Sequence, residues 1–128
     1  KKHEKNFHQT FFIKGKRKKR RIIDFLFTKL MSIFVFIICQ IRLNDINGQP
    51  KIFHKNLKNY LIDNSPDDFS LDLHILLKYK NKYFNIDEEN IDIYERKYDD
   101  AKGGGSFMGK LHLSLKTIKY ILKYALKK

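Results

Sequence analysis

A glycine-rich segment near the C-terminus carries the residues best spaced for chemistry. Gly104-Gly105-Ser106-Phe107-Met108-Gly109-Lys110 satisfies the first seven positions of G-x-x-x-x-G-K-[ST], the loop that cradles nucleotide phosphates. The eighth position is Leu111, whereas a nucleotide-hydrolysing site needs a Ser or Thr hydroxyl there to hold magnesium. We therefore expect no NTP binding. The glycines still let backbone amides approach an anion at the start of a helix, and a ribose-phosphate backbone would satisfy that geometry.

The other reactive side chains form no catalytic or metal-binding pattern. The five histidines have no spacing that places two on one face with a carboxylate, and the single Cys39 cannot complete a zinc cluster. The acidic pairs Asp67-Asp68, Glu88-Glu89 and Asp99-Asp100 are typical of solvated loops, since adjacent residues point apart. Ser106 has no arranged base. The sequence predicts no enzyme, no cofactor, no metal and no small-molecule substrate.

Positive charge is concentrated at the two ends of the chain. The net charge is +13, and residues 1–21 carry ten Lys or Arg against the single acid Glu4. Residues 101–128 carry seven Lys and no acid, whereas residues 44–100 hold twelve acids and eight bases. This separation favours a polyanionic partner, with nucleic acid first and an anionic membrane second. A basic bias needed only for solubility would spread the charge evenly.

The length predicts one domain over residues 22–128, preceded by a basic extension over residues 1–21. Gly15 interrupts the extension, and six consecutive bases follow from Lys16 to Arg21. Such a block repels itself until an anion neutralises it, so we expect an extended arm that orders on RNA. A nuclear localisation signal or a solvated tail is the alternative.

The stretch Ile22–Leu43 has two interpretations. A membrane helix needs about 20 apolar residues, and Asp24 and Lys29 interrupt this one. Its Ile, Val and Phe content favours two strands, Ile22–Thr28 and Ser32–Leu43. A signal anchor behind basic residues is the alternative.

The middle of the chain predicts short elements separated by turns. Turn residues occupy 44–50, and apolar spacing over Ile52–Ile62 predicts a short amphipathic helix. Alternating apolar residues predict a strand from Phe69 to Ile75 and another around Ile91–Tyr94, with a polar connection over Lys80–Asn90.

The last segment predicts an amphipathic helix over about Lys110–Lys127. Residues spaced by three and four form its apolar row, which we expect to pack on the sheet: Leu111, Leu115, Ile118, Leu122 and Ala125. A second stripe is basic and is expected to meet anions: Lys116, Lys119, Lys123 and Lys127. Ordinary solvated lysines are the alternative.

The order of these features resembles protein nine of the small ribosomal subunit. That family opens with Gly followed by Arg and Lys, as in Gly15-Lys16-Arg17-Lys18. It continues with a V-N-G-R-P-like turn before a short helix ending in Tyr-Phe, compared here with Ile46–Pro50 and Leu57–Leu61. Its strongest motif is an alternating strand, then K-G-G-G, then a helix ending in R-A-L. Here these are Ile91–Tyr94, Lys102–Gly105 and a helix that ends in Tyr124-Ala125-Leu126.

The resemblance spans about residues 15–126 and carries expectations. It implies an α/β (α+β) domain with a mixed four-stranded sheet and helices packed on one side, in the head of the small subunit. Its partners would be ribosomal RNA and neighbouring small-subunit proteins, bound through phosphate and sugar contacts. Together with the basic pattern, the residues expected to bind RNA are Lys14, Lys16, Arg17, Lys18, Lys19, Arg20, Arg21, Lys102, Gly103, Gly104, Gly105, Lys110, Lys116, Lys119, Lys123, Lys127 and Lys128.

The sequence also departs from that family. Ile22–Phe25 replaces small residues, and the family's long basic tail, which reaches transfer RNA, is missing after Lys128. A transfer RNA contact is therefore not expected. This divergence and a start at Lys1 favour a mitochondrial version in the matrix, with a cytoplasmic ribosome as the alternative.

Two hypotheses that belong to other functional classes stay open. One is a membrane-anchored accessory subunit of an organellar complex, with Ile22–Leu43 as its transmembrane helix. The other is an exported factor with a leader cleaved near Asn44.

Overall fold

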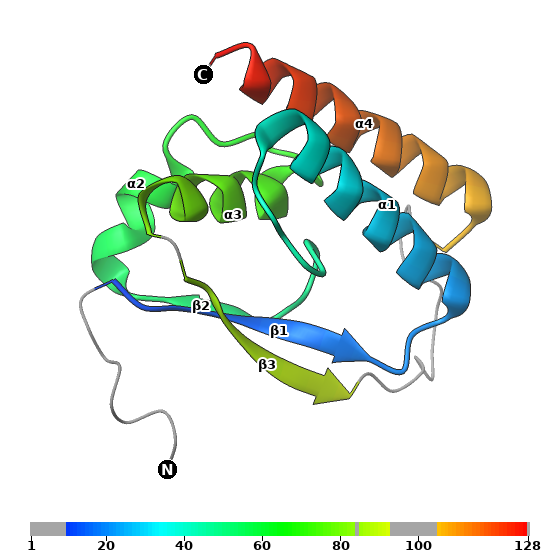
Figure 1. Cartoon of the computed structure of the whole chain (residues 1–128), viewed down its shortest axis with the longest axis horizontal. Helices are drawn as coiled ribbons and strands as arrows, with labels where there is room; N and C mark the ends of the chain where they lie inside the picture. Colours follow the sequence, from blue (N-terminus) through cyan, green and yellow to red (C-terminus); the bar gives the residue numbers. More distant parts are fainter. Residues whose placement is uncertain (1–9, 84, 93–104, 128) are drawn as a thin grey trace.

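The computed structural model describes residues 10–83, 85–92 and 105–127, and it shows a small sheet with helices on one side (Figure 1). Strand β1 (Phe12–Lys18) is central, with β2 (Lys51–Phe53) antiparallel on one edge and β3 (Asp87–Asp92) parallel on the other. The α+β class and the mixed sheet were predicted correctly. The sheet in the described residues has three strands, not four.

The central strand lies inside the region predicted as an arm. Phe12, Lys14 and Gly15 are buried, so residues 12–18 belong to the domain and the predicted boundary at residue 22 is wrong. The basic side chains are tolerated in a strand because acids from β3 and from the loop after the first helix neutralise several of them. Residues 1–9 lie outside the described part of the chain.

Helix α1 (Ile22–Cys39) occupies the segment predicted as two strands, so that prediction is wrong. The β-branched content favoured strands, but no Gly, Pro or Asn lies between residues 22 and 39 to turn the chain between them. A largely apolar segment of 18 residues without a turn residue is long for a strand and ordinary for a helix. The helix ends at Gln40, which has the left-handed φ of 58° common at helix ends.

Helix α3 (Leu71–Lys82) replaces the predicted strand from Phe69 to Ile75. The alternation of Leu73 and Ile75 suggested one buried face, but Leu76 and Leu77 are buried as well. A helix buried on most sides loses the 3.6-residue period, and a short window of it then imitates a strand. Acid in its first turn and lysines in its last turn match the helix dipole.

The segment between α1 and α3 is only partly as predicted. Instead of one helix over Ile52–Ile62, the chain forms β2, a 3₁₀ turn η1 (Lys55–Leu57) and the short helix α2 (Lys58–Ile62).

The strand predicted near Ile91 exists, but it begins at Asp87. Part of the connection predicted over Lys80–Asn90 is therefore strand, and Ile93 and Tyr94 lie outside the described residues.

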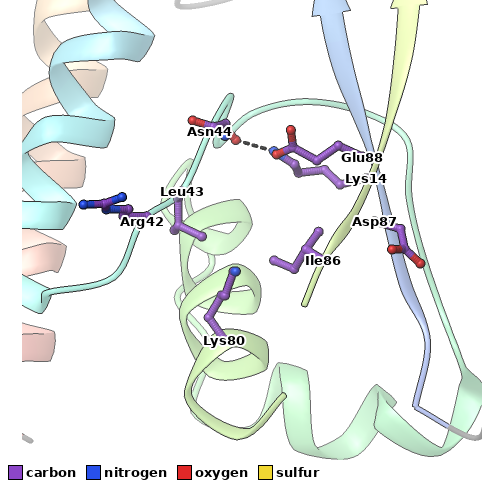
Figure 2. A pocket seen from close by; sticks show the side chains of 8 residues that line it. All are labelled: Lys14, Arg42, Leu43, Asn44, Lys80, Ile86, Asp87 and Glu88. Carbon is purple, nitrogen blue, oxygen red and sulfur yellow. Dashed lines mark hydrogen bonds and ion pairs between the residues drawn. The ribbon is translucent and has the colours of Figure 1, made fainter. Parts of the chain in front are cut away.

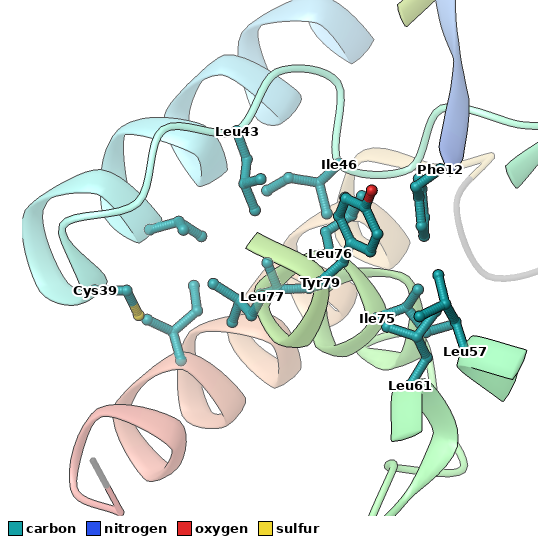
Figure 3. Close-up of a cluster of buried hydrophobic side chains, with 13 residues drawn as sticks. Phe12, Cys39, Leu43, Ile46, Leu57, Leu61, Ile75, Leu76, Leu77 and Tyr79 are labelled. Atoms are coloured by element: carbon teal, nitrogen blue, oxygen red, sulfur yellow. The ribbon is translucent and has the colours of Figure 1, made fainter. Parts of the chain in front are cut away.

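Helix α3 lies between the sheet and the remaining long helices (Figure 1). Its Tyr79 ring lies 4.7 Å from that of Phe12 on β1, and its His74 Nδ1 lies 2.5 Å from the Tyr120 hydroxyl on helix α4 (Phe107–Ala125). The core is built around this helix, and Figure 3 shows it with side chains from the sheet, α1 and the loop after α1.

Helix α4 confirms the predicted terminal helix, but its buried face is not the predicted one. Thr117 and Ile121 are buried, whereas Leu111, Leu115 and Leu122 are exposed. The helix packs beside α1 rather than on the sheet, because α3 already covers that space. Its buried row contains a threonine and tyrosines, so it looked less apolar than the exposed leucine row.

Candidate nucleic-acid interface

A buried carboxylate organises the basic end of β1. Asp45 lies in the loop after α1 and accepts hydrogen bonds from the Arg17 backbone N–H at 2.8 Å and from the Arg17 guanidinium at 2.5 Å and 3.0 Å. Arg20 reaches the same carboxylate at 3.1 Å. Burial alone would raise the pKa of Asp45, but hydrogen bonds from Arg17 and the two guanidinium charges outweigh it and lower that pKa. Arg17 and Arg20 therefore hold the loop after α1 against the end of β1.

Lys14 is unavailable to RNA because the fold encloses it. Its amino group is 3.0 Å from Glu88 Oε1 on β3 and also donates to the Asn44 carbonyl oxygen, and the residue is 1% exposed. A buried ammonium needs such partners to offset its lost hydration. The prediction that Lys14 binds RNA is corrected: Lys14 joins β3 to the loop after α1.

A hollow of about 190 Å³ lies at the junction of β1 and α1. Lys16, Arg20 and Lys29 line it, and Asp45 is the acid in the lining. Lys18 and Arg21 project nearby into solvent, while Lys19 pairs with Asp92 at an exposed position, 3.1 Å away. The region keeps an excess of positive charge around a cavity with room for a phosphate.

The glycine loop is only partly described, because Lys102, Gly103 and Gly104 lie outside the described residues. Ser106 caps α4 by accepting a hydrogen bond from the Gly109 N–H at 3.0 Å. Lys110, the lysine of the phosphate-loop pattern, lies 3.3 Å from Asp24 of α1 and 3.3 Å from the Gly105 carbonyl oxygen. Lys110 therefore joins the first turns of α1 and α4.

The four lysines predicted as a stripe on α4 are all exposed: Lys116, Lys119, Lys123 and Lys127. No ion pair joins them to a carboxylate within residues 10–83, 85–92 and 105–127, and α4 itself contains no acid. Lys128, predicted with them, lies outside the described residues. The stripe begins in the middle of α4 and runs to its C-terminal end, away from the hollow at β1. The structure therefore separates the predicted site into two basic groups.

The two outer helices also expose an apolar face, and its leucines on α4 were predicted to pack on the sheet. Here the outer apolar face denotes these exposed side chains, recurring at helical spacing on α1 and α4: Leu26, Leu30, Ile33, Ile37, Leu111, Leu115 and Leu122. Among the described residues, α1 alone is long and apolar enough to cross a membrane, with mean hydropathy 2.3 over 18 residues and 11% of them buried.

A second cavity, of about 370 Å³, opens between α3, the start of β3 and the loop after α1 (Figure 2). Its lining mixes Lys14, Arg42 and Lys80 with Asp87 and Glu88. The charges nearly balance, and the Lys14–Glu88 ion pair occupies part of the wall. Within the part of the chain that the structure describes, no three His, Cys, Asp or Glu residues are grouped to hold a metal.

Comparisons with known proteins do not add a relative. No protein-family model, no curated protein and no solved structure matches the chain.

Proposed function

We propose that this chain is a non-enzymatic RNA-binding protein and a structural constituent of the small ribosomal subunit, within an organellar ribosome of the mitochondrial matrix. The observation that carries the RNA-binding proposal is the lysine stripe on α4. Ribosomal RNA and neighbouring small-subunit proteins would be its partners.

The stripe has the length and charge that a nucleic-acid backbone requires. From Lys116 to Lys123 it extends about 10 Å along α4 at about 1.5 Å per residue, and Lys127 follows two residues after the helix ends. That distance covers several phosphates, and each neutralised phosphate releases condensed counterions. Because flexible lysines reach phosphates rather than base edges, we expect recognition of shape with little sequence preference.

The hollow at the β1–α1 junction supplies the second contact. Lys16 and Lys29 line it, and Arg20 is held by Asp45 in a fixed orientation. Preorganised cations of this kind lose little conformational entropy when a phosphate arrives. Lys18 and Arg21 extend the positive surface beyond the hollow.

Two of the sequence segments that resemble the ribosomal family pack against each other, which supports the ribosomal part of the proposal. Gly15 donates its backbone N–H to the Pro50 carbonyl oxygen at 2.9 Å. A Cβ on Gly15 would overlap the Gln49 carbonyl oxygen, and one on Gly48 would overlap the Gly15 carbonyl oxygen. The glycines at the start of the basic run and in the Asn-Gly turn are thus required by one close backbone contact.

Salt-dependent RNA binding tests the α4 contact. We expect the double variant Lys119→Ala, Lys123→Ala to reduce the slope of log K against log salt by about 1.4–1.8, because each lost phosphate contact contributes about 0.7–0.9. Lys55→Ala, Lys58→Ala is the matched control, since it removes the same charge from exposed positions near α2. Equal slopes for the two double variants would show that net charge, not the stripe, drives binding.

Ribosomal assembly needs a separate test. The native protein should comigrate with small-subunit RNA on a density gradient at high salt. RNA binding in solution without such comigration would retain the RNA-binding function and refute the ribosomal one.

A further inference from the structure

We infer that the outer apolar face docks in the plane of a bilayer that carries anionic phospholipids, with α1 and α4 lying along its surface. This inference rests on the apolar side chains of the face, which the RNA-binding proposal does not use, and it shares with that proposal the lysine stripe of α4 and Arg21. Four observations support it: the exposure of the face, its extent over two helices, the charges around it, and the contacts that keep α1 attached to α4.

The exposure of α1 is unlike that of a core helix. Leu30 is 55% exposed and Ile37 is 63% exposed, and the buried residues of α1 are Ser32, Val35 and Cys39. Val35 is thus the one large aliphatic side chain among the buried residues of α1, while Leu26, Leu30, Ile33 and Ile37 are exposed. Soluble monomers rarely expose contiguous apolar patches larger than a few hundred Å², so a face of this kind marks an interaction site.

Helix α4 continues the same surface. Figure 1 shows α4 beside α1, and two contacts join their first turns: Phe27 with Phe107, at 5.7 Å between ring centroids, and Asp24 with Lys110. Leu111, Leu115 and Leu122 follow at helical spacing on the outer side of α4. Two parallel rows of aliphatic side chains therefore form one broad face.

The charges around this face match an anionic membrane. On α4 the lysine stripe lies next to the leucine row, on the side turned away from Phe107 and therefore from α1. Arg21 precedes α1 and Arg42 follows it, both exposed. Asp24 is the single acidic residue of the two helices α1 and α4, and it is paired with Lys110. An apolar face bordered by cations is the pattern of helices that lie in the headgroup region.

The packing favours an in-plane orientation over a spanning one. Val35 and Cys39 are buried in the core, and Asp24 is paired with α4. Crossing the bilayer would remove α1 from these contacts and expose the core that it covers. Lying flat leaves the fold intact and buries only side chains that are already exposed.

The absence of tryptophan provides a direct test. We expect the full chain carrying Leu30→Trp, at the middle of α1, to show a blue-shifted emission on vesicles of phosphatidylglycerol and phosphatidylcholine. Quenching should be strongest with lipids brominated at shallow acyl positions, since in-plane helices insert by roughly 5–10 Å. Ile52→Trp on β2 is the matched control, because Ile52 is also exposed, at 50%, and lies outside the face; its emission should not change.

Charge variants complete the test. Leu30→Glu should weaken vesicle binding about tenfold or more, whereas Ile52→Glu should not, and neither should alter the salt dependence of RNA binding. Strongest quenching at the bilayer centre would overturn the inference in favour of a spanning helix. No blue shift of Leu30→Trp would overturn it as well. A lipid-free dimer that Leu30→Glu dissociates, without vesicle binding by the parent chain, would assign the face to a second copy.

Discussion

Two neighbouring residues of α4 provide a sharp test of which side of the helix faces the core. Ile121 is fully buried against the cluster that includes Val35 and Cys39, whereas Leu122 is 48% exposed. The two side chains are isomers, so changing either to alanine removes the same atoms from the same helix. The sequence pattern alone places Leu122 in the core, so it predicts the opposite order of effects.

The expected loss for Ile121→Ala is about 2–5 kcal/mol, because the truncation removes buried methyl groups and leaves a cavity between α1, α3 and α4. Leu122→Ala should cost no more than about 0.5–1 kcal/mol, since half of that side chain already contacts solvent. Urea unfolding measures both values, with an unchanged m value as evidence that the variants unfold from comparable native states. In a thermal melt the Ile121 variant should unfold on the order of 10 °C earlier. A larger loss for Leu122→Ala than for Ile121→Ala would refute the assigned face.

Two further predictions concern the same fold. Burial, with Lys78 nearby, lowers the pKa of His74 below its ordinary 6.5, so unfolding takes up a proton and stability should fall as pH drops below 6.5. The lowered pKa of Asp45 should cause a second fall below pH 3.8. Urea unfolding across pH would show the first step missing in His74→Gln and the second step smaller in Asp45→Asn, since the pKa of Asp63 is lowered as well. Gly48→Ala should destabilise the fold by at least about 1–3 kcal/mol, because its Cβ would overlap the Gly15 carbonyl oxygen. Gly109→Ala, inside the first turn of α4, is the control and should stabilise the fold by about 0.5–1 kcal/mol. An unchanged free energy of unfolding in Gly48→Ala would contradict the close contact.

Sequence reasoning succeeded where local signals agreed with the tertiary structure. The terminal helix and the turn over residues 44–50 were predicted because periodicity and turn residues mark them directly, whereas the mixed sheet was predicted from the family resemblance. It failed for α1 and α3, whose burial patterns are set by neighbours: α3 is enclosed on most sides and α1 exposes its most apolar residues. Neither pattern has the single apolar stripe that identifies a surface helix.

The candidate site shows the same limit. The exposure of the lysines of α4 could be predicted from helical spacing, but the ion-pair partners of Lys14 and Arg17 could not. Glu88 and Asp45 lie far along the chain from these bases, and only the pairing of β1 with β3 and the path of the loop after α1 bring them together. The acid-rich middle of the sequence was the available signal that some basic residues form ion pairs within the fold.

The parallel pairing of β1 with β3 also affects the order in which the chain can fold during synthesis. Ile13 pairs with Asp87, 74 positions later (87 minus 13). At about 5–20 residues per second, a ribosome needs roughly 4–15 s to make the intervening segment. During that interval the nascent chain carries α1 without α4 beside it and a central strand with one edge unpaired. Factors that bind apolar helices as they leave the exit tunnel would therefore meet α1 before the domain can form around it.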